Sequence, residues 1–182
     1  MKWPGNVNIT RNNVSFYLNL GSPMQHNDFK NISRTAAKGV AGHSERMLMV
    51  KTYRHGYKFP GGGAKAGEDL LQALSREIKE ETGMSVVNIG NEVGTVYEKR
   101  PDIYDPLKNF IMKTVFIKCS IDETAFCELS LDAYEKELGF TPVFISIKEA
   151  IAENEHIIMA NPDFDPWLFR DTMVLKRLLG NF

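Results

Sequence analysis

The segment from Gly62 to Met84 constrains the fold of this chain more than any other. Glu68 and Asp69 suit the positive end of a helix, and Gly83 suits a left-handed cap at its other end. Apolar residues between them recur at spacings of one, three and four: Leu70, Leu71, Leu74 and Ile78. This spacing predicts a helix over 68–82 with one apolar stripe. We therefore expect an amphipathic helix that is packed on its leucine side and directly follows a glycine turn.

Three acids lie on one edge of this helix, beside the stripe. Glu77 and Glu80 are three residues apart and Glu77 and Glu81 four apart, so their side chains are neighbours on the helix surface. Like charges at this spacing repel one another, and Lys79 lies on a different side from Glu77. A hard cation such as Mg²⁺ or Mn²⁺, which takes oxygen ligands, would fill the cluster. The alternative is an ordinary helix with a charged outer face.

A glycine-rich loop, Phe59-Pro60-Gly61-Gly62-Gly63, leads into the helix. Proline fixes its own φ, and glycine permits positive φ and a close approach of the backbone to a ligand. A backbone carbonyl of the loop can face a metal ion, although a tight turn between a strand and a helix explains the same residues. A phosphate-binding P-loop is excluded, because Lys65 does not follow a glycine and precedes Ala66 rather than Ser or Thr.

The spacing of Gly62, Glu68 and the run from Arg76 to Met84 resembles the signature of the Nudix hydrolases at every fixed place. That family hydrolyses diphosphates attached to another group, usually nucleoside diphosphate derivatives, with a divalent metal. The resemblance implies an α/β protein, an α/β/α sandwich with a mixed central sheet. It also implies two parts of the chain, an N-terminal extension over residues 1–33 and a Nudix domain over 34–182. We call the segment 62–84 the box.

The resemblance assigns roles to single residues. It implies that Glu80 and Glu81 hold the metal, that Glu77 is a further ligand or the proton acceptor, and that the carbonyl of Gly61 faces the metal. Some members recruit a glutamate outside the box, and Glu137 is the first candidate for it here, with an exposed loop charge as the alternative. The acids considered after it are Glu135, Glu128 and Glu123.

Arg76 and Glu68 complete the expected active site. In the family, the matching arginine and first glutamate orient the metal ligands, so Arg76 is expected among the catalytic residues and Glu68 as an orienting residue. From spacing alone, Arg76 can pair with Glu68 or with Glu77. The alternative is a surface pair with Glu80 at i,i+4.

The residues that choose the substrate lie outside the box. Arg54, Lys58 and Arg100 are candidates to meet phosphate, and Tyr97 is a candidate to stack on a base. For each of them, a lone surface cation or a core aromatic is the alternative. The sequence leaves the substrate open among ADP-ribose, nucleotide sugars and dinucleoside polyphosphates.

Composition bounds the function. The chain has 182 residues and a formal net charge of −1, so it carries no electrostatic footprint for nucleic acid, which counts against an RNA-end hydrolase. Two cysteines make no disulfide framework, and no apolar run suggests a signal peptide or a bilayer span. We therefore expect a cytoplasmic protein, and the resemblance implies a nucleotide-derived small molecule as its partner. A homodimer is one arrangement open to residues 1–33, besides packing on the domain or disorder.

One rival function stays open at this stage: a Nudix-like module that binds a nucleotide and regulates a partner without turnover. Such members usually lose acids from the box, whereas this chain keeps them all.

The remaining helices and strands are predicted from patterns of apolar residues and turns. The predicted strands are 14–20, 35–42, 46–53, 57–59, 86–97, 109–120 and 143–147, and the predicted helices are 147–153 and 166–179, with a short helix or turn at 131–138.

Overall fold

The computed structural model of the chain describes residues 16–21, 30–43, 45–53, 56–102, 105, 107–161 and 165–180. In chain order, its elements are β1 (Phe16–Gly21), β2 (Lys30–Val40), β3 (Gly42–His43), β4 (Arg46–Thr52), β5 (Gly56–Lys58), α1 (Leu70–Thr82), β6 (Ser85–Pro101), β7 (Lys108–Asp122), α2 (Ala133–Glu137), β8 (Thr141–Ser146), α3 (Ile147–Ala160) and α4 (Pro166–Leu179).

The strands form two sheets. The first has the order β1-β6-β7-β2 and is mixed, because β6 and β7 are antiparallel while β1 runs parallel to β6 and β2 parallel to β7. The second is antiparallel, and in it β4 pairs with β3, β5 and β8. The predicted mixed sheet is therefore confirmed. The second sheet was not predicted, since the pattern of one strand does not identify its distant partner.

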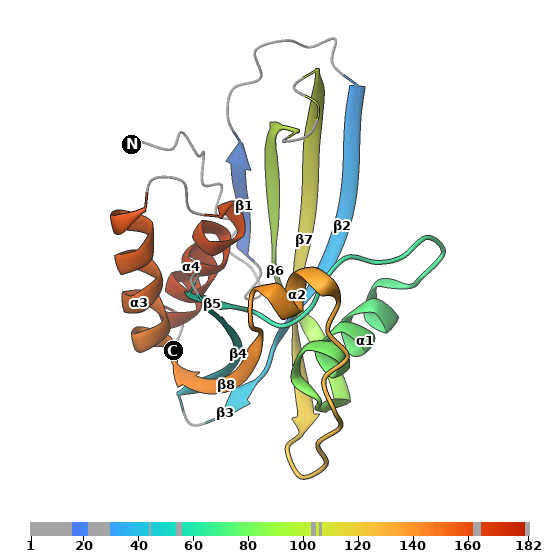
Figure 1. Cartoon of the computed structure of the whole chain (residues 1–182), viewed down its shortest axis with the longest axis vertical. Coiled ribbons are helices and arrows are strands. Elements are labelled where there is room, and N and C mark those ends of the chain that lie inside the picture. The colour runs from blue at the N-terminus through green and yellow to red at the C-terminus, as the bar shows by residue number, and fades with distance from the viewer. Residues whose placement is uncertain are drawn as a thin grey trace.

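Helices cover both sides of the sheets, with α1 on one side and α3 and α4 on the other (Figure 1). Two apolar cores separate accordingly. In one core, Leu74 and Ile78 of α1 pack with Ile117 of β7. In the other, Phe116, which precedes Ile117 in β7, packs with Leu175 of α4. Successive residues of a strand point to opposite faces, so one strand supplies both cores. This arrangement is the predicted sandwich.

Helix α1 begins two residues later than predicted. The side chain of Asp69 accepts hydrogen bonds from backbone N–H groups of the first turn, which makes Asp69 the N-cap and leaves Glu68 outside the helix. Leu71 is 43% exposed and so is not part of the buried stripe. Gly83 ends the helix with φ of 72°, as its place in the sequence predicts.

Part of the predicted N-terminal extension lies in the first sheet. Strand β1 pairs with residues 94–99 of β6, and β2 begins at Lys30, so described residues on the N-terminal side of position 34 belong to the sandwich. Residues 1–15 and 22–29 of the extension lie outside the described ranges.

The two C-terminal helices pack against each other and against β5. Helix α3 is capped by Ser146 as predicted, but it continues to Ala160, well beyond position 153. In that additional part, Asn154 is buried and bonds to the backbone of Tyr57 in β5. Helix α4 has its predicted bounds and begins with Pro166. Among the described residues, none of the helices has the length and apolar content needed to cross a bilayer.

Candidate active site

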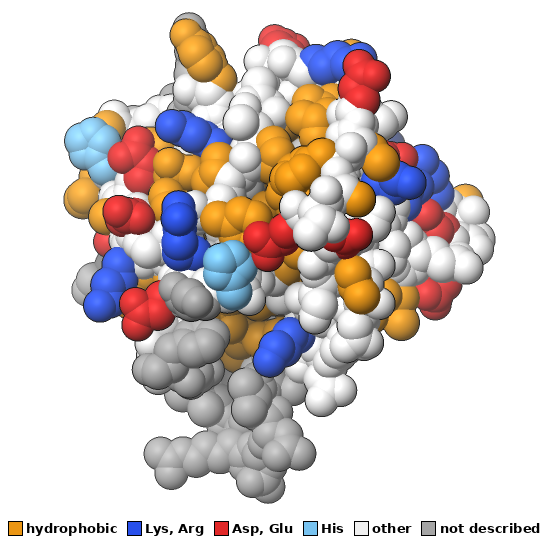
Figure 2. All heavy atoms as spheres, turned by 90° about the horizontal axis from the view of Figure 1, so that it is seen from below, with side chains coloured by type: hydrophobic (Ala, Val, Ile, Leu, Met, Phe, Trp, Pro, Cys, Tyr) orange, Lys and Arg blue, Asp and Glu red, His pale blue; other side chains and the backbone are white. Residues whose placement is uncertain are grey.

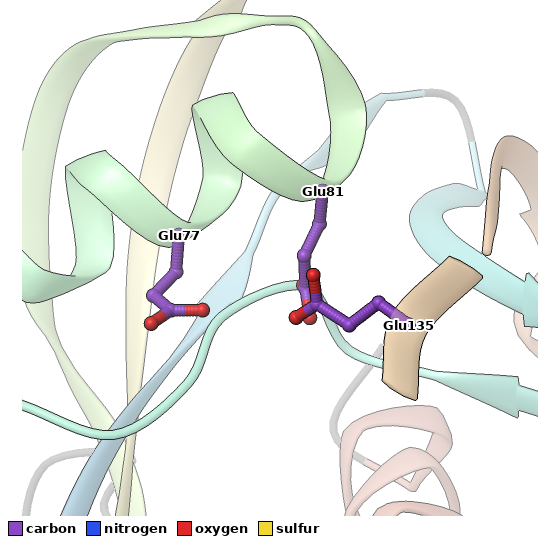
Figure 3. A group of neighbouring side chains, drawn as sticks. All are labelled: Glu77, Glu81 and Glu135. Carbon is purple, nitrogen blue, oxygen red and sulfur yellow. The ribbon is translucent and has the colours of Figure 1, made fainter. Parts of the chain in front are cut away.

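Three carboxylates gather beside the glycine loop. Glu77 and Glu81 come from α1 and Glu135 from α2, and one oxygen of each lies within 4.8 Å of the other two. Figure 3 shows Glu77 and Glu81 pointing to the same side of α1, with Glu135 reaching toward them from α2. Oxygens on opposite sides of a bound magnesium ion lie about 4.2 Å apart. The spacing and the hard oxygen donors therefore fit a divalent cation after small side-chain adjustments.

Glu81 is the buried member of this cluster, with only 1% of its surface exposed. Lys58 Nζ donates to its Oε1 at 2.8 Å, and the Gly61 N–H donates to its Oε2 at 2.6 Å. These donors offset the cost of burying a charged carboxylate. A carboxylate has about four lone-pair sites, so the two bonds leave room for an ion.

Lys58, a predicted phosphate contact, belongs to this cluster. Its ammonium pairs with Glu81 and lies 3.9 Å from the centroid of the Phe140 ring, and its side chain is 13% exposed. The lysine therefore balances the charge of the buried carboxylate.

Glu135 is held in place by the short helix that carries it. The Asp132 N–H donates to Glu135 Oε2 at 2.9 Å, and the Glu135 N–H donates to Asp132 Oδ1 at 2.8 Å, which is a capping box. Burial raises the pKa of the Glu135 carboxyl, the Asp132 N–H opposes this, and the negative charge of Glu81 adds to it. A glutamate with a raised pKa is a better proton acceptor.

Glu137, the acid that we expected from outside the box, is exposed and lies outside the cluster. Residues two apart on a helix point about 200° away from each other, so only one of Glu135 and Glu137 can face the box. Glu135, which the sequence suggested only after Glu137, is the residue of α2 that lies with Glu77 and Glu81.

Arg76 connects most of the acids of the box. Its Nε and Nη2 donate to the two oxygens of Glu68 at 2.7 and 2.9 Å, and its Nη1 donates to Glu77 at 2.7 Å and to Glu80 at 2.8 Å. All three pairings weighed from the sequence are therefore present together. The bonds from Arg76 lower the pKa of the Glu68 carboxyl to about 2. Glu80, a predicted metal ligand, pairs with Arg76 and lies outside the group of three carboxylates.

The glycine loop packs closely against β2 and the box. Gly61 has φ of 122°, and a Cβ there would lie 2.3 Å from the carbonyl oxygen of Ala37. A Cβ on Gly62 would lie 2.4 Å from Glu77 Oε2. The Ala37 N–H also donates to the Gly62 carbonyl at 3.0 Å, which ties the loop to β2. The positive φ and the backbone contact require glycine at position 61, whereas a side chain at position 62 would displace the Glu77 carboxylate.

Lys38 of β2 is a site residue that the sequence analysis missed. It is 5% exposed, and its ammonium donates to the Gly61 carbonyl, the group that we expected to face the metal. Burial, reinforced by the nearby charge of Lys58 and opposed by Glu81, lowers the pKa of Lys38 to about 8. The sequence indicated Lys38 only by placing a lysine among the small and apolar residues of a predicted strand.

Helix α4 contributes a second residue that was missed. Asp171 is fully buried and accepts a hydrogen bond from the N–H of Phe59, at the start of the glycine loop, at 2.9 Å. Its signal was its position, three residues after Leu168 and four before Leu175, which places a charge on an apolar stripe.

The other predicted substrate contacts are not brought together. Tyr97 and Arg100 are three apart on β6, so they point to opposite faces of the sheet. The Arg100 guanidinium lies over the Phe110 ring, 4.6 Å from its centroid, and Tyr97 is half-buried. Arg54 lies outside the described residues.

Comparison with protein families gives one match that covers most of the chain. A family described as NUDIX domain matches residues 34–159. The matched region includes the box, both helices that carry the three carboxylates, and most of α3, whereas β1 and α4 lie outside it.

Solved structures of similar fold include the E. coli ORF135 protein, which is 18% identical with a TM-score of 0.52 over 87% of this chain and 94% of that one. Another is a MutT NUDIX hydrolase from Burkholderia pseudomallei, 15% identical with a TM-score of 0.44 over 64% of this chain and 85% of that one. At these identities, the first likeness shows the fold alone.

Proposed function

We propose that this chain, which belongs to the NUDIX domain family, is a pyrophosphohydrolase that cleaves the diphosphate linkage of a nucleoside diphosphate derivative with Mg²⁺ or Mn²⁺. The substrates in view are ADP-ribose, a nucleotide sugar or a dinucleoside polyphosphate. One observation carries the proposal: Glu77, Glu81 and Glu135 converge, one oxygen of each within 4.8 Å of the others, beside a loop that approaches them closely.

The residues of the cluster divide the work. Glu77, Glu81 and Glu135 would hold the ion, which when bound would supply positive charge beside the phosphoryl oxygens and make water more acidic. Arg76 keeps Glu77 in position through its bond at 2.7 Å. Glu135 accepts the proton from the attacking water, because its carboxylate is bonded to the neutral Asp132 N–H, whereas Glu77 is paired with Arg76 and Glu81 with Lys58.

Two exposed aromatic residues support a nucleotide-derived substrate. Tyr134 is on α2, next to Glu135, and is 55% exposed. Tyr53 is 78% exposed, and its N–H donates to the carbonyl of Leu138 at 2.7 Å, so it lies at the other end of the same short helix. An exposed ring beside a phosphate site suits stacking on a base. These tyrosines replace Tyr97 as our candidates for base contact.

The rival function is nucleotide binding without turnover. The complete set of box acids and the convergence of Glu135 on Glu77 and Glu81 favour hydrolysis. RNA ends remain the less favoured substrate: on the face in Figure 2, basic and acidic side chains are interspersed, whereas nucleic-acid sites gather basic residues. The cytoplasm stays our expected compartment, and both cysteines are free thiols.

A substrate panel tests the proposal. Purified protein would be incubated with Mg²⁺ or Mn²⁺ and ADP-ribose, nucleotide sugars, dinucleoside polyphosphates, NADH, coenzyme A, nucleoside triphosphates and capped RNA, and the products separated by chromatography. We expect cleavage between phosphates in a nucleoside diphosphate derivative. Glu81→Gln should keep the fold at reduced stability, because its amide oxygen still accepts from the Gly61 N–H while Lys58 loses its carboxylate partner. It should lose at least about 100-fold in kcat/KM.

Two results would contradict the proposal. If no compound of the panel is cleaved while one of them binds in the micromolar range, the protein is a binding module. If Glu81→Gln turns over the best substrate within a few-fold of the wild type, the carboxylate cluster is not the catalytic site.

A further inference from the structure

Strand β5 is an edge strand whose free side is bonded by helix side chains. In the described sheet, it pairs with β4 alone. Asn154 of α3 accepts from the Tyr57 N–H at 2.8 Å and donates to the Tyr57 carbonyl at 2.9 Å. Asp171 of α4 accepts from the Phe59 N–H at 2.9 Å. The buried backbone groups of this edge are therefore satisfied by α3 and α4 rather than by another strand.

The orientation of Asp171 is set by two other charged residues. Arg170 Nε donates to Asp171 Oδ1 at 2.8 Å, which leaves Oδ2 for the Phe59 N–H. The same guanidinium donates through Nη1 to Glu98 of β6 at 3.0 Å. All three charged side chains are buried, so a rigid pair of bonds connects α4 to the first sheet.

Asp171 bonds to the first residue of the glycine loop, Phe59, which lies two positions before Gly61. Phe59 is followed by Pro60 and then Gly61, whose N–H donates to Glu81 at 2.6 Å. A displaced Phe59 would move Gly61, and the buried Glu81 would lose a bond that sets its direction. A continuous path of short contacts therefore runs from α4, outside the matched family region, to the carboxylate cluster.

We propose that Asp171 is a positioning residue for the active site: its bond to the Phe59 N–H fixes the backbone of 59–61 and, through the Gly61 N–H, the carboxylate of Glu81. The part of this inference that concerns metal binding rests on the proposed function. The part that concerns the loop does not, since it follows from the hydrogen bonds alone.

Two substitutions of Asp171 separate positioning from general stability. Asp171→Asn keeps an oxygen for the Phe59 N–H but loses the charge opposite Arg170, whereas Asp171→Leu loses both. Both lower the midpoint of thermal unfolding. We expect Asp171→Leu alone to raise amide exchange in the segment 59–63 and to weaken Mn²⁺ binding about tenfold, with Asp171→Asn staying within threefold of the wild type. Hydrogen-exchange mass spectrometry and calorimetric titration with Mn²⁺ measure the two effects.

Asn154→Ala is the matched control. It removes buried hydrogen bonds from the same strand edge, but at Tyr57, which lies farther from Gly61 along the chain than Phe59 does. It should destabilise the protein but leave Mn²⁺ affinity within threefold. The inference is overturned if folded Asp171→Leu exchanges amides in 59–63 at the wild-type rate, or if Asn154→Ala weakens Mn²⁺ binding as much as Asp171→Leu does. If wild-type protein binds no Mn²⁺, the proposed function fails, and the exchange data alone decide the role of Asp171.

Discussion

Two arginines of this protein sit among carboxylates in contrasting ways. Arg76 bonds to Glu68, Glu77 and Glu80, all within eight residues of it, and its side chain is 21% exposed. Arg170 bonds to its neighbour Asp171 and to Glu98, which is 72 residues away, and it is 7% exposed. The first network lies on one helix and the turn before it, whereas the second joins a C-terminal helix to a central strand.

The difference teaches where each network acts. Acids around Arg76 are partly solvated and repel one another, so they keep the capacity to bind a cation. Arg170 has no solvent to replace a lost partner, so its network contributes to the stability and rigidity of the fold. We therefore expect substitutions around Arg76 to change activity more than stability, and those around Arg170 to change stability first.

The largest effect on stability should come from Arg170→Met. It leaves Asp171 and Glu98 as buried charges without their partner, and breaking such a pair costs about 3–5 kcal/mol. Urea unfolding followed by circular dichroism measures the loss. Lys176→Met on the same helix is the control, because its pair with Glu155 is exposed and should contribute less than about 1 kcal/mol. Equal losses in the two variants would remove the contrast between buried and exposed networks.

Glu135→Gln should lower activity and leave stability unchanged, in contrast to Arg170→Met. Glutamine keeps the capping box with Asp132, so the midpoint of unfolding should not move, but the loss of a carboxylate should lower kcat/KM by about 100-fold. Steady-state kinetics on the best substrate of the panel measure this. Glu137→Gln should stay within twofold, since Glu137 is exposed and points away. A larger loss of kcat/KM in Glu137→Gln than in Glu135→Gln would mean that Glu137 is the acid outside the box that takes part in catalysis.

Neighbouring glycines give a smaller, local test of the box. A methyl group on Gly62 would lie 2.4–2.9 Å from the Glu77 carboxyl group and displace it, so Gly62→Ala should lower kcat/KM by about tenfold, or about 1.4 kcal/mol. A methyl group on Gly63 would meet only the Thr35 carbonyl oxygen, at 3.9 Å, so Gly63→Ala should stay within twofold. Similar losses for both would mean that loop flexibility, rather than the place of Glu77, controls activity.

The smallest effect concerns pH and the bond between Arg76 and Glu68. The folded pKa of Glu68 is about 2, below its ordinary value of 4.5, so the folded state binds this proton less readily than the unfolded state. The stabilisation is complete above about pH 4.5 and is lost as the pH falls toward 2. Thermal unfolding of wild type and Glu68→Gln between pH 2 and 7 should give midpoints that differ at neutral pH and converge in acid. A constant difference would contradict the assigned bond.

The box shows how far local pattern reaches. Helix α1, its glycine end and the pairing of Arg76 with nearby acids could be predicted, because a helix brings residues three and four apart together wherever it sits. The predicted metal ligands agree with the structure only in part. Glu77 and Glu81 lie together as predicted, but the third carboxylate beside them is Glu135, while Glu80 pairs with Arg76. Which acid outside the box joins it depends on how α2 is turned, and its capping box sets that.

By itself, the sequence determined the family, the mixed α/β fold and the chemistry of the box, since these depend on spacing within one element and on alternation along strands. Only the tertiary structure decided which residues from distant segments lie near the box. Glu135 of α2 lies with the box acids, and Lys38 of β2 and Asp171 of α4 bond to the loop just before the box. The distances of these residues from the box along the chain do not predict those contacts. Contacts between distant segments follow from how whole faces pack, and packing depends on every buried residue at once.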